Sequence, residues 1–134
     1  MSKPVLEIEN LSVSFMTRTA EVPAVMDFSM EVNEGDAMGL VGESGCGKST
    51  VALAIMNYLG GNGKIVGGSI KYRGRDMSTF SEKELENIRG SEIAMIYQEP
   101  MASLNPAMRV SSQLIEVPIL HEKVSNEEAW NRSV

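Results

Sequence analysis

The nine residues from 42 to 50 decide how this chain folds, and they read Gly42-Glu43-Ser44-Gly45-Cys46-Gly47-Lys48-Ser49-Thr50. They match the phosphate-loop pattern G-x-x-x-x-G-K-[ST]. The glycines permit backbone angles that a Cβ would forbid, so successive N–H groups can turn toward one anion. A helix that begins at the end of the loop adds its unpaired N–H groups and its positive dipole end to the same site. The motif therefore predicts a site for a nucleoside triphosphate.

The motif also assigns roles to individual side chains. We expect Lys48 to reach the β- and γ-phosphates, which makes it the first candidate catalytic residue. The Ser49 hydroxyl is expected to ligate the Mg²⁺ that bridges those phosphates, and Thr50 to hydrogen-bond a phosphate nearer the sugar. The loop residues expected to bind the cofactor are Gly42, Ser44, Gly45, Cys46, Gly47, Lys48, Ser49 and Thr50. Cys46 stands just before the expected helix, where bound nucleotide would cover it.

The residues on either side of the loop support this interpretation. The apolar run 37–41 predicts a buried strand that delivers the chain into the loop. The segment from Val51 to Leu59 predicts a mostly buried helix that stops at Gly60-Gly61. The alternative is an ordinary glycine-rich turn, and the order of strand, loop and helix favours the phosphate loop.

Antiparallel strands are expected on both sides of this unit. In residues 5–15 the apolar positions are Leu6 and Ile8 and then Leu11, Val13 and Phe15, so the phase of the strand changes near Asn10. Residues 24–32 alternate, with an inward set of Ala24, Met26, Phe28, Met30 and Val32. The glycine-rich stretch 60–68 is expected to be irregular, and residues 69–73 to form another strand closed by Gly74.

The rest of the chain predicts helices and one further strand. Capping-box spacings at 81–84 and 125–128 each announce a helix, the first ending at Gly90. Residues 110–121 predict a helix that Pro118 kinks or ends. Residues 92–97 resemble a buried strand with Gln98 at its C-terminal end, where ligand-contacting residues cluster in open α/β sheets. Gln98 is thus a candidate contact to Mg²⁺ or to a water near the γ-phosphate; the alternative is an ordinary loop residue.

Composition narrows the classes of partner. The 134 residues fit one domain, and the 12 Lys and Arg are scattered against 18 Asp and Glu, so we expect no nucleic-acid partner. The single cysteine excludes an internal disulfide and is typical of a reducing compartment. The N-terminus lacks the apolar core of a signal peptide, and no apolar run approaches the ~18 residues of a membrane span. We expect no direct membrane insertion.

Three stretches together resemble the nucleotide-binding subunit of an ATP-binding-cassette (ABC) transporter: VGESGCGKST at 41–50, GGSIKYRGRDM at 67–77 and EIAMIYQEPMASLNP at 92–106. The nearest subgroup is the dipeptide/oligopeptide and nickel importers. The resemblance implies an α/β P-loop NTPase fold that is incomplete. Residues 1–134 would form one N-terminal part of an ABC ATP-binding domain, with an antiparallel β subdomain and the first part of the α/β core.

The resemblance implies further site residues. Phe15 falls where the family places an aromatic ring that stacks on adenine; the alternative is a core strand residue. Gln98 falls on the family's Q-loop glutamine, which approaches Mg²⁺ and the attacking water. It is therefore a candidate catalytic residue together with Lys48, and a candidate metal ligand together with Ser49. The implied cofactors are ATP and Mg²⁺.

The family's signature motif, Walker B aspartate, catalytic glutamate and switch histidine do not occur in these residues. His121 follows the Q-loop too closely to be the switch histidine and is expected on the surface or at a helix end. We therefore expect that this polypeptide alone does not hydrolyse ATP at a family-like rate. We also expect open apolar faces at Val41, Met95 and Ile96.

The function that the resemblance implies is the ATP-binding part of an importer ATPase that energises uptake of di- or oligopeptides or a related small solute. Its partners would be transmembrane permease subunits and a second ABC ATPase subunit, identical or different. It would be peripheral at the cytoplasmic face of the plasma membrane. The alternatives are a non-transport ABC ATPase of DNA repair or translation, a P-loop kinase or GTPase, and an inert fragment.

Overall fold

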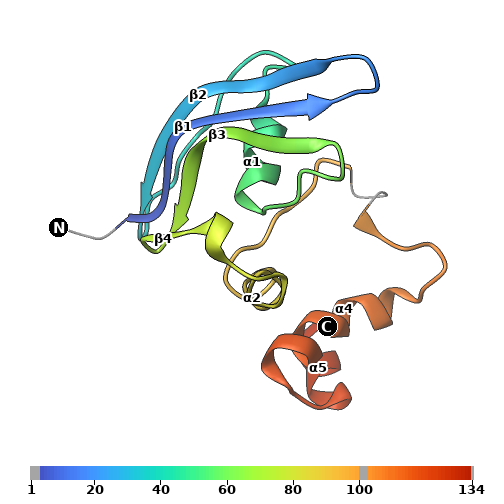
Figure 1. The fold of residues 1–134 in the computed structure, drawn as a ribbon. Helices are drawn as coiled ribbons and strands as arrows, with labels where there is room; N and C mark the ends of the chain where they lie inside the picture. Colours follow the sequence, from blue (N-terminus) through green and yellow to red (C-terminus); the bar gives the residue numbers. More distant parts are fainter. Residues whose placement is uncertain (1–3, 100–102, 134) are drawn as a thin grey trace. The chain divides into compact units, whose positions relative to one another are not determined.

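The computed structural model describes residues 4–99 and 103–133. The chain divides into two compact units, residues 1–82 and residues 83–134, and each is described by itself. The first unit holds strands β1 (Pro4–Met16), β2 (Glu21–Asn33), β3 (Gly63–Tyr72) and β4 (Arg75–Asp76) and helix α1 (Lys48–Ile55). The second unit holds most of α2 (Glu82–Ile88), with α4 (Val110–Glu122) and α5 (Asn126–Ser133) (Figure 1).

The first unit is an antiparallel sheet in the order β2-β1-β3-β4, with α1 against one face of it (Figure 1). The strands bury apolar side chains at alternate positions, and α1 buries Val51 and Ala54. Its core consists of Ile8, Leu11, Val13, Val25, Val51, Ala54, Ile70, Tyr72 and Met77. The expected N-terminal antiparallel subdomain is thereby confirmed.

The expected phase change in the first strand is confirmed, and a second one corrects the prediction for β2. Asn10 has a φ of 49°, and the pairing of β1 with β2 shifts between Ile8 and Leu11. On β2 the prediction that Met26 faces inward and Val25 outward is wrong: Val25 is 8 % exposed, whereas Met26 is 76 % exposed. The later inward positions Phe28, Met30 and Val32 are half-buried, as predicted. Asp27 has a φ of 52°, so the extra residue there reverses the alternation.

Helix α1 ends earlier than predicted. It stops at Ile55 rather than near Leu59, because Asn57 adopts a left-handed φ of 50° in place of the expected glycine. The Tyr58 N–H donates to the Leu53 carbonyl at 2.8 Å and the Asn57 N–H to the Ala54 carbonyl at 2.9 Å, which is a Schellman cap. The stretch expected to be irregular is also corrected, since β3 starts at Gly63 and pairs with β1 from there.

The strands predicted over residues 37–41 and 92–97 are wrong. Neither segment is paired in a sheet, apart from an isolated bridge between Arg89 and Ile93. A buried strand needs neighbours that satisfy its backbone, and the described residues supply none here. Val41 is 91 % exposed and Ile96 98 % exposed, which confirms the expectation of open apolar faces; Met95 is half-buried.

The helices of the second unit follow their sequence patterns closely. In α2, Leu85 and Ile88 are buried, and Gly90 follows with a φ of 87°. Pro118 lies inside α4 and has no N–H, so the Leu114 carbonyl loses its helical hydrogen bond from that position. The Ser133 hydroxyl of α5 donates to this carbonyl at 3.4 Å. Ser125 accepts the Glu128 N–H at 3.2 Å, as the second capping box predicts. His121 lies in the last turn of α4, so its expected helix-end position is confirmed.

Helix α1 can lie against β2 only because Gly47 has no side chain. Gly47 precedes the helix with a φ of 94°, and an added Cβ would lie 2.5 Å from the Ala24 carbonyl oxygen. Gly47→Ala should therefore lower the free energy of unfolding by about 2 kcal/mol or more, from the left-handed backbone and the clash together. Chemical denaturation followed by circular dichroism measures this loss.

Gly45→Ala is the matched control. Gly45 also has a left-handed φ, of 81°, but nothing lies within 4 Å of an added Cβ. This variant should carry the backbone cost alone, roughly 1 kcal/mol. Equal losses in the two variants would contradict the close packing of Gly47 on β2.

The β3–β4 turn supports a second prediction. Arg73 and Gly74 have φ values of 48° and 79°, as a two-residue type I′ turn requires, and Asp76 then caps a 3-10 turn over Met77–Thr79 by accepting the Ser78 N–H at 2.8 Å. Hydrogen bonds from the Ser78 side chain and then from its backbone hold the pKa of Asp76 below its ordinary value of 3.8.

A lowered carboxyl pKa stabilises the folded state above the unfolded-state value, and this contribution is lost as the pH falls through the folded-state value. We expect Asp76→Ala to flatten the loss of unfolding free energy between about pH 5 and pH 2. Ser78→Ala, which keeps the carboxyl group, should flatten it in part. Parallel pH profiles for the wild-type chain and Asp76→Ala, measured by denaturation, would show that the cap contributes nothing.

Candidate nucleotide site

Lys48 is held by the loop that precedes it. It is the first residue of α1, and its Nζ donates to the Gly42 carbonyl at 2.7 Å and to the Glu43 carbonyl at 2.6 Å. The same Nζ lies 3.4 Å from the Cys46 Sγ. The loop thus closes around its own cation, and these carbonyls keep the ammonium group at the mouth of the helix.

The backbone of the loop provides donors for an anion. The first hydrogen bond of the helix runs from the Val51 N–H to the Gly47 carbonyl at 2.9 Å. The N–H groups of Lys48, Ser49 and Thr50 therefore have no carbonyl partner inside the helix. Gly47 caps the helix without a side-chain bond, and no acidic residue stands in its first turn. A Cβ on Gly42 would lie 2.5 Å from the Cys46 Sγ, which explains the glycine at that position. These features fit a phosphate group.

The residues also fit a magnesium ion that arrives with the phosphates. Ser49 is exposed at the start of α1, and its hydroxyl is a hard oxygen ligand. Magnesium usually keeps several waters and takes one or two protein ligands together with substrate phosphates. In the part of the chain that the structure describes, no group of three or more His, Cys, Asp or Glu residues could hold a metal alone.

Phe15 belongs to the same unit as the loop. It lies near the end of β1, half-buried, where it pairs with Val22 on one side and with Gly63 on the other. Two residues earlier on β1, Val13 pairs with Val25, whose Cγ2 lies 3.2 Å from the position of a Cβ on Gly47. Phe15 and the β2 residue that contacts Gly47 are therefore on the same section of the sheet.

Gln98 belongs to the other unit. It is exposed and lies in a bend after the unpaired residues 94–97. Its contact with a metal or an attacking water stays a prediction. Residues 100–102 of the Q-loop-like stretch lie outside the described residues.

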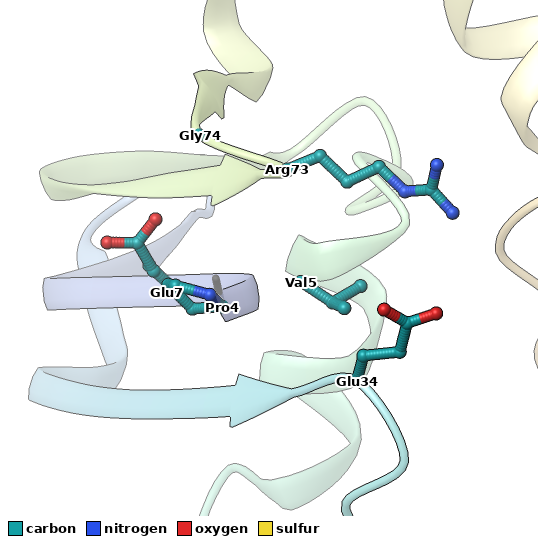
Figure 2. A pocket seen from close by; sticks show the side chains of 6 residues that line it. All are labelled: Pro4, Val5, Glu7, Glu34, Arg73 and Gly74. Carbon is teal, nitrogen blue, oxygen red and sulfur yellow. The ribbon is translucent and has the colours of Figure 1, made fainter. Parts of the chain in front are cut away.

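A cavity of about 570 Å³ lies at the other end of the sheet and is lined by Pro4, Val5, Glu7, Glu34, Arg73 and Gly74. Arg73 and Glu34 extend on the same side with Val5 between them, and Glu7 points away from them (Figure 2). Pro4 pairs with Asn33, whereas Phe15 pairs with Val22 at the far end of the same strand. Two carboxylates against one guanidinium disfavour a triphosphate, so the loop remains the candidate phosphate site.

Two features of the site were not visible in the sequence. The partners of Lys48 are the backbone carbonyls of Gly42 and Glu43, and no side-chain pattern marks a backbone acceptor in the sequence. Gly47 packs against Ala24 and Val25 of β2, which stand more than twenty residues earlier in the chain. In the sequence, only the glycine itself indicates that another backbone approaches closely there.

Among the described residues, no helix has the length and apolar character needed to cross a membrane.

Comparison with known proteins identifies the family. Residues 25–133 match the family described as ABC transporter. The chain is 46 % identical over 129 residues to the oligopeptide transport ATP-binding protein OppD of Salmonella typhimurium, covering 96 % of this chain and 38 % of that protein. It is 41 % identical over 126 residues to the dipeptide transport ATP-binding protein DppD of Bacillus subtilis, covering 93 % of this chain and 38 % of that protein. The chain thus spans less than half the length of these relatives.

A solved structure shows the fold. The ATP-binding cassette MJ0796, in a dimeric post-hydrolysis state bound to ADP and phosphate, matches with a TM-score of 0.81 at 22 % identity, over 96 % of this chain and 53 % of that one. The expected P-loop NTPase fold of an ABC ATP-binding domain is confirmed, and the kinase and GTPase alternatives fall away. The chain belongs to the ABC transporter family.

Proposed function

We propose that residues 42–50 bind ATP with Mg²⁺, and that the chain is the ATP-binding part of an importer ATPase that energises uptake of di- or oligopeptides. The observation that carries the proposal is the closed loop, in which Lys48 Nζ is held by two carbonyls beside the unpaired N–H groups of α1. The peptide-transport names of relatives at 46 % and 41 % identity support the class of solute.

In this proposal each residue has a defined task. The loop N–H groups bind phosphate oxygens, and Lys48 turns from the Gly42 and Glu43 carbonyls toward the β- and γ-phosphates. The Ser49 hydroxyl would hold Mg²⁺, which supplies charge neutralisation at the phosphates when bound. Phe15 would stack on the adenine, and Gln98 would contact the metal or orient the attacking water.

The proposed partners follow from the same relatives. A transport ATP-binding protein energises a membrane permease, so we propose permease subunits as partners at the cytoplasmic face of the membrane. A second ATPase subunit is proposed because the structurally similar ATP-binding cassette MJ0796 forms a dimer. The transport names of the relatives favour this role over a non-transport ABC ATPase.

Lys48→Ala tests the nucleotide site. The variant removes the ammonium group that the loop holds at the helix mouth. Because a hydrogen bond to a charged group contributes about 1.5–3 kcal/mol, ATP·Mg²⁺ affinity should fall roughly 100-fold in calorimetry. Lys64→Ala, which removes an exposed charge from β3 in the same unit, is the control and should bind normally. Unchanged affinity in Lys48→Ala would refute the site.

Cys46 offers an independent readout of occupancy. Its thiol is exposed and lies 3.4 Å from the Lys48 Nζ, inside the loop that a phosphate would fill. Bound ATP should therefore slow alkylation of Cys46 by iodoacetamide, followed by mass spectrometry. The protection should disappear in Lys48→Ala. If the alkylation rate is the same with and without ATP in the wild-type chain, the nucleotide does not occupy this loop.

A further inference from the structure

Three neighbouring strands each carry one left-handed residue at the same level of the sheet. They are Asn10 on β1 with a φ of 49°, Asp27 on β2 with 52° and Gly68 on β3 with 77°. The pairing of β1 with β2 shifts between Ile8 and Leu11, and its pairing with β3 shifts between Glu9 and Ser12. We call this line of three residues the crease. A positive φ is uncommon outside glycine, so two such residues side by side need a cause.

Side chains replace the backbone ladder along the crease. The Asn10 Nδ2 donates to the Asp27 Oδ1 at 2.6 Å, and the Asn10 N–H donates to the Ser29 Oγ at 2.9 Å. The Asp27 N–H donates to the Ser12 Oγ at 3.1 Å. A Cβ on Gly68 would lie 2.3 Å from the Glu9 carbonyl oxygen, so only glycine fits beside Asn10. The crease is thus hydrogen-bonded and closely packed.

The crease changes which side chains face α1. Successive residues of a strand point to opposite faces, and one extra residue exchanges the faces for everything beyond it. Ile8 stands before Asn10 at an even position, and Leu11 and Val13 stand after it at odd positions, yet all three are buried. Without the bulge at Asn10, Val13 and Phe15 would point to the face opposite Ile8.

Phe15 shares the parity of Val13, and its surroundings place it on the face of α1. The Phe15 Cε1 lies 3.0 Å from the position of a Cβ on Gly63, and the Leu59 Cβ lies 2.7 Å from that same point. Leu59 belongs to the segment that follows α1. Val13 pairs with Val25, which packs against Gly47. The bulge at Asn10 therefore brings Phe15 to the side of the sheet that carries the phosphate loop.

We propose that Asn10, held by Asp27 and Gly68, is a positioning residue that turns Phe15 toward the nucleotide base. The inference rests on the proposed binding of ATP at residues 42–50. The crease would then determine the part of the ATP affinity that depends on the base, whereas the loop would make the phosphate contacts. A base stacked on an aromatic ring gains roughly 5- to 150-fold in affinity.

The test compares two ligands, ATP and inorganic tripolyphosphate, each with Mg²⁺, by calorimetry on the 134-residue chain. Asn10→Val should disfavour the left-handed backbone, because a β-branched side chain does not tolerate it, and it removes the bond to Asp27. Asn10→Gly also loses that bond but keeps the backbone angle. We expect Asn10→Val to lower the ratio of ATP to tripolyphosphate affinity about tenfold or more. Tripolyphosphate binding should be unchanged, and Asn10→Gly should keep most of the ratio.

A double-mutant cycle shows whether Asn10 acts through Phe15. If it does, Asn10→Val should cost nothing further in a Phe15→Ala background. Additive losses, or an equal loss for both ligands, would overturn the proposal and leave Asn10 a merely structural residue. An unchanged ratio in Phe15→Ala would overturn it as well. Loss of all binding in the wild-type chain would instead refute the phosphate loop.

A measurement without ligand keeps the proposal testable in that last case. Nuclear Overhauser contacts between the Phe15 ring and the Leu59 side chain should be present in the wild-type chain and in Asn10→Gly. They should be lost in Asn10→Val while the contacts of Ile8 remain. Retention of the Phe15–Leu59 contact in Asn10→Val would show that Asn10 does not set the direction of Phe15.

Discussion

The close approach of Gly47 to the backbone of β2 is the contact on which the rest of the first unit depends. Because Gly47 has no Cβ, the loop can lie against the Ala24 carbonyl, and α1 can bury Val51 and Ala54 against the sheet. The approach also fixes where Lys48 begins the helix, directly after the glycine. One missing side chain thus couples an anion-binding loop to an antiparallel sheet.

The parts of the fold that were predictable are those with local causes. The phosphate loop is specified by residues that act within one turn, since Gly45 and Gly47 supply positive φ and Lys48 supplies the charge. The bulge on β1 could be predicted because the apolar residues change from even positions, up to Ile8, to odd positions, from Leu11 onward. On β2 the corresponding bulge was hidden, because Asp27 is polar and suits an outward position in either register. Alternation alone therefore assigned Met26 to the core.

What the sequence could not predict depends on partners that are distant in the chain. Residues 37–41 and 92–97 have the composition of buried strands, yet Val41 and Ile96 are among the most exposed apolar residues described. An apolar run states only that a segment can be buried, whereas pairing needs neighbouring strands. The same distinction separates the candidate residues: Lys48 has its contacts within six residues, whereas Gln98 stands fifty residues after Lys48 and belongs to the other unit.

In the proposed site, recognition of phosphate and recognition of base would depend on different kinds of structure. The proposed phosphate contacts would come from backbone donors and one cation within residues 42–50, so they would be present wherever the loop folds. The direction of Phe15 instead depends on a bulge five residues earlier and on hydrogen bonds to the neighbouring strand. Substitutions in the crease could therefore alter preference for the base without changing any residue of the motif. A phosphate loop identifies a nucleotide site, but the register of the adjoining sheet determines which face meets the base.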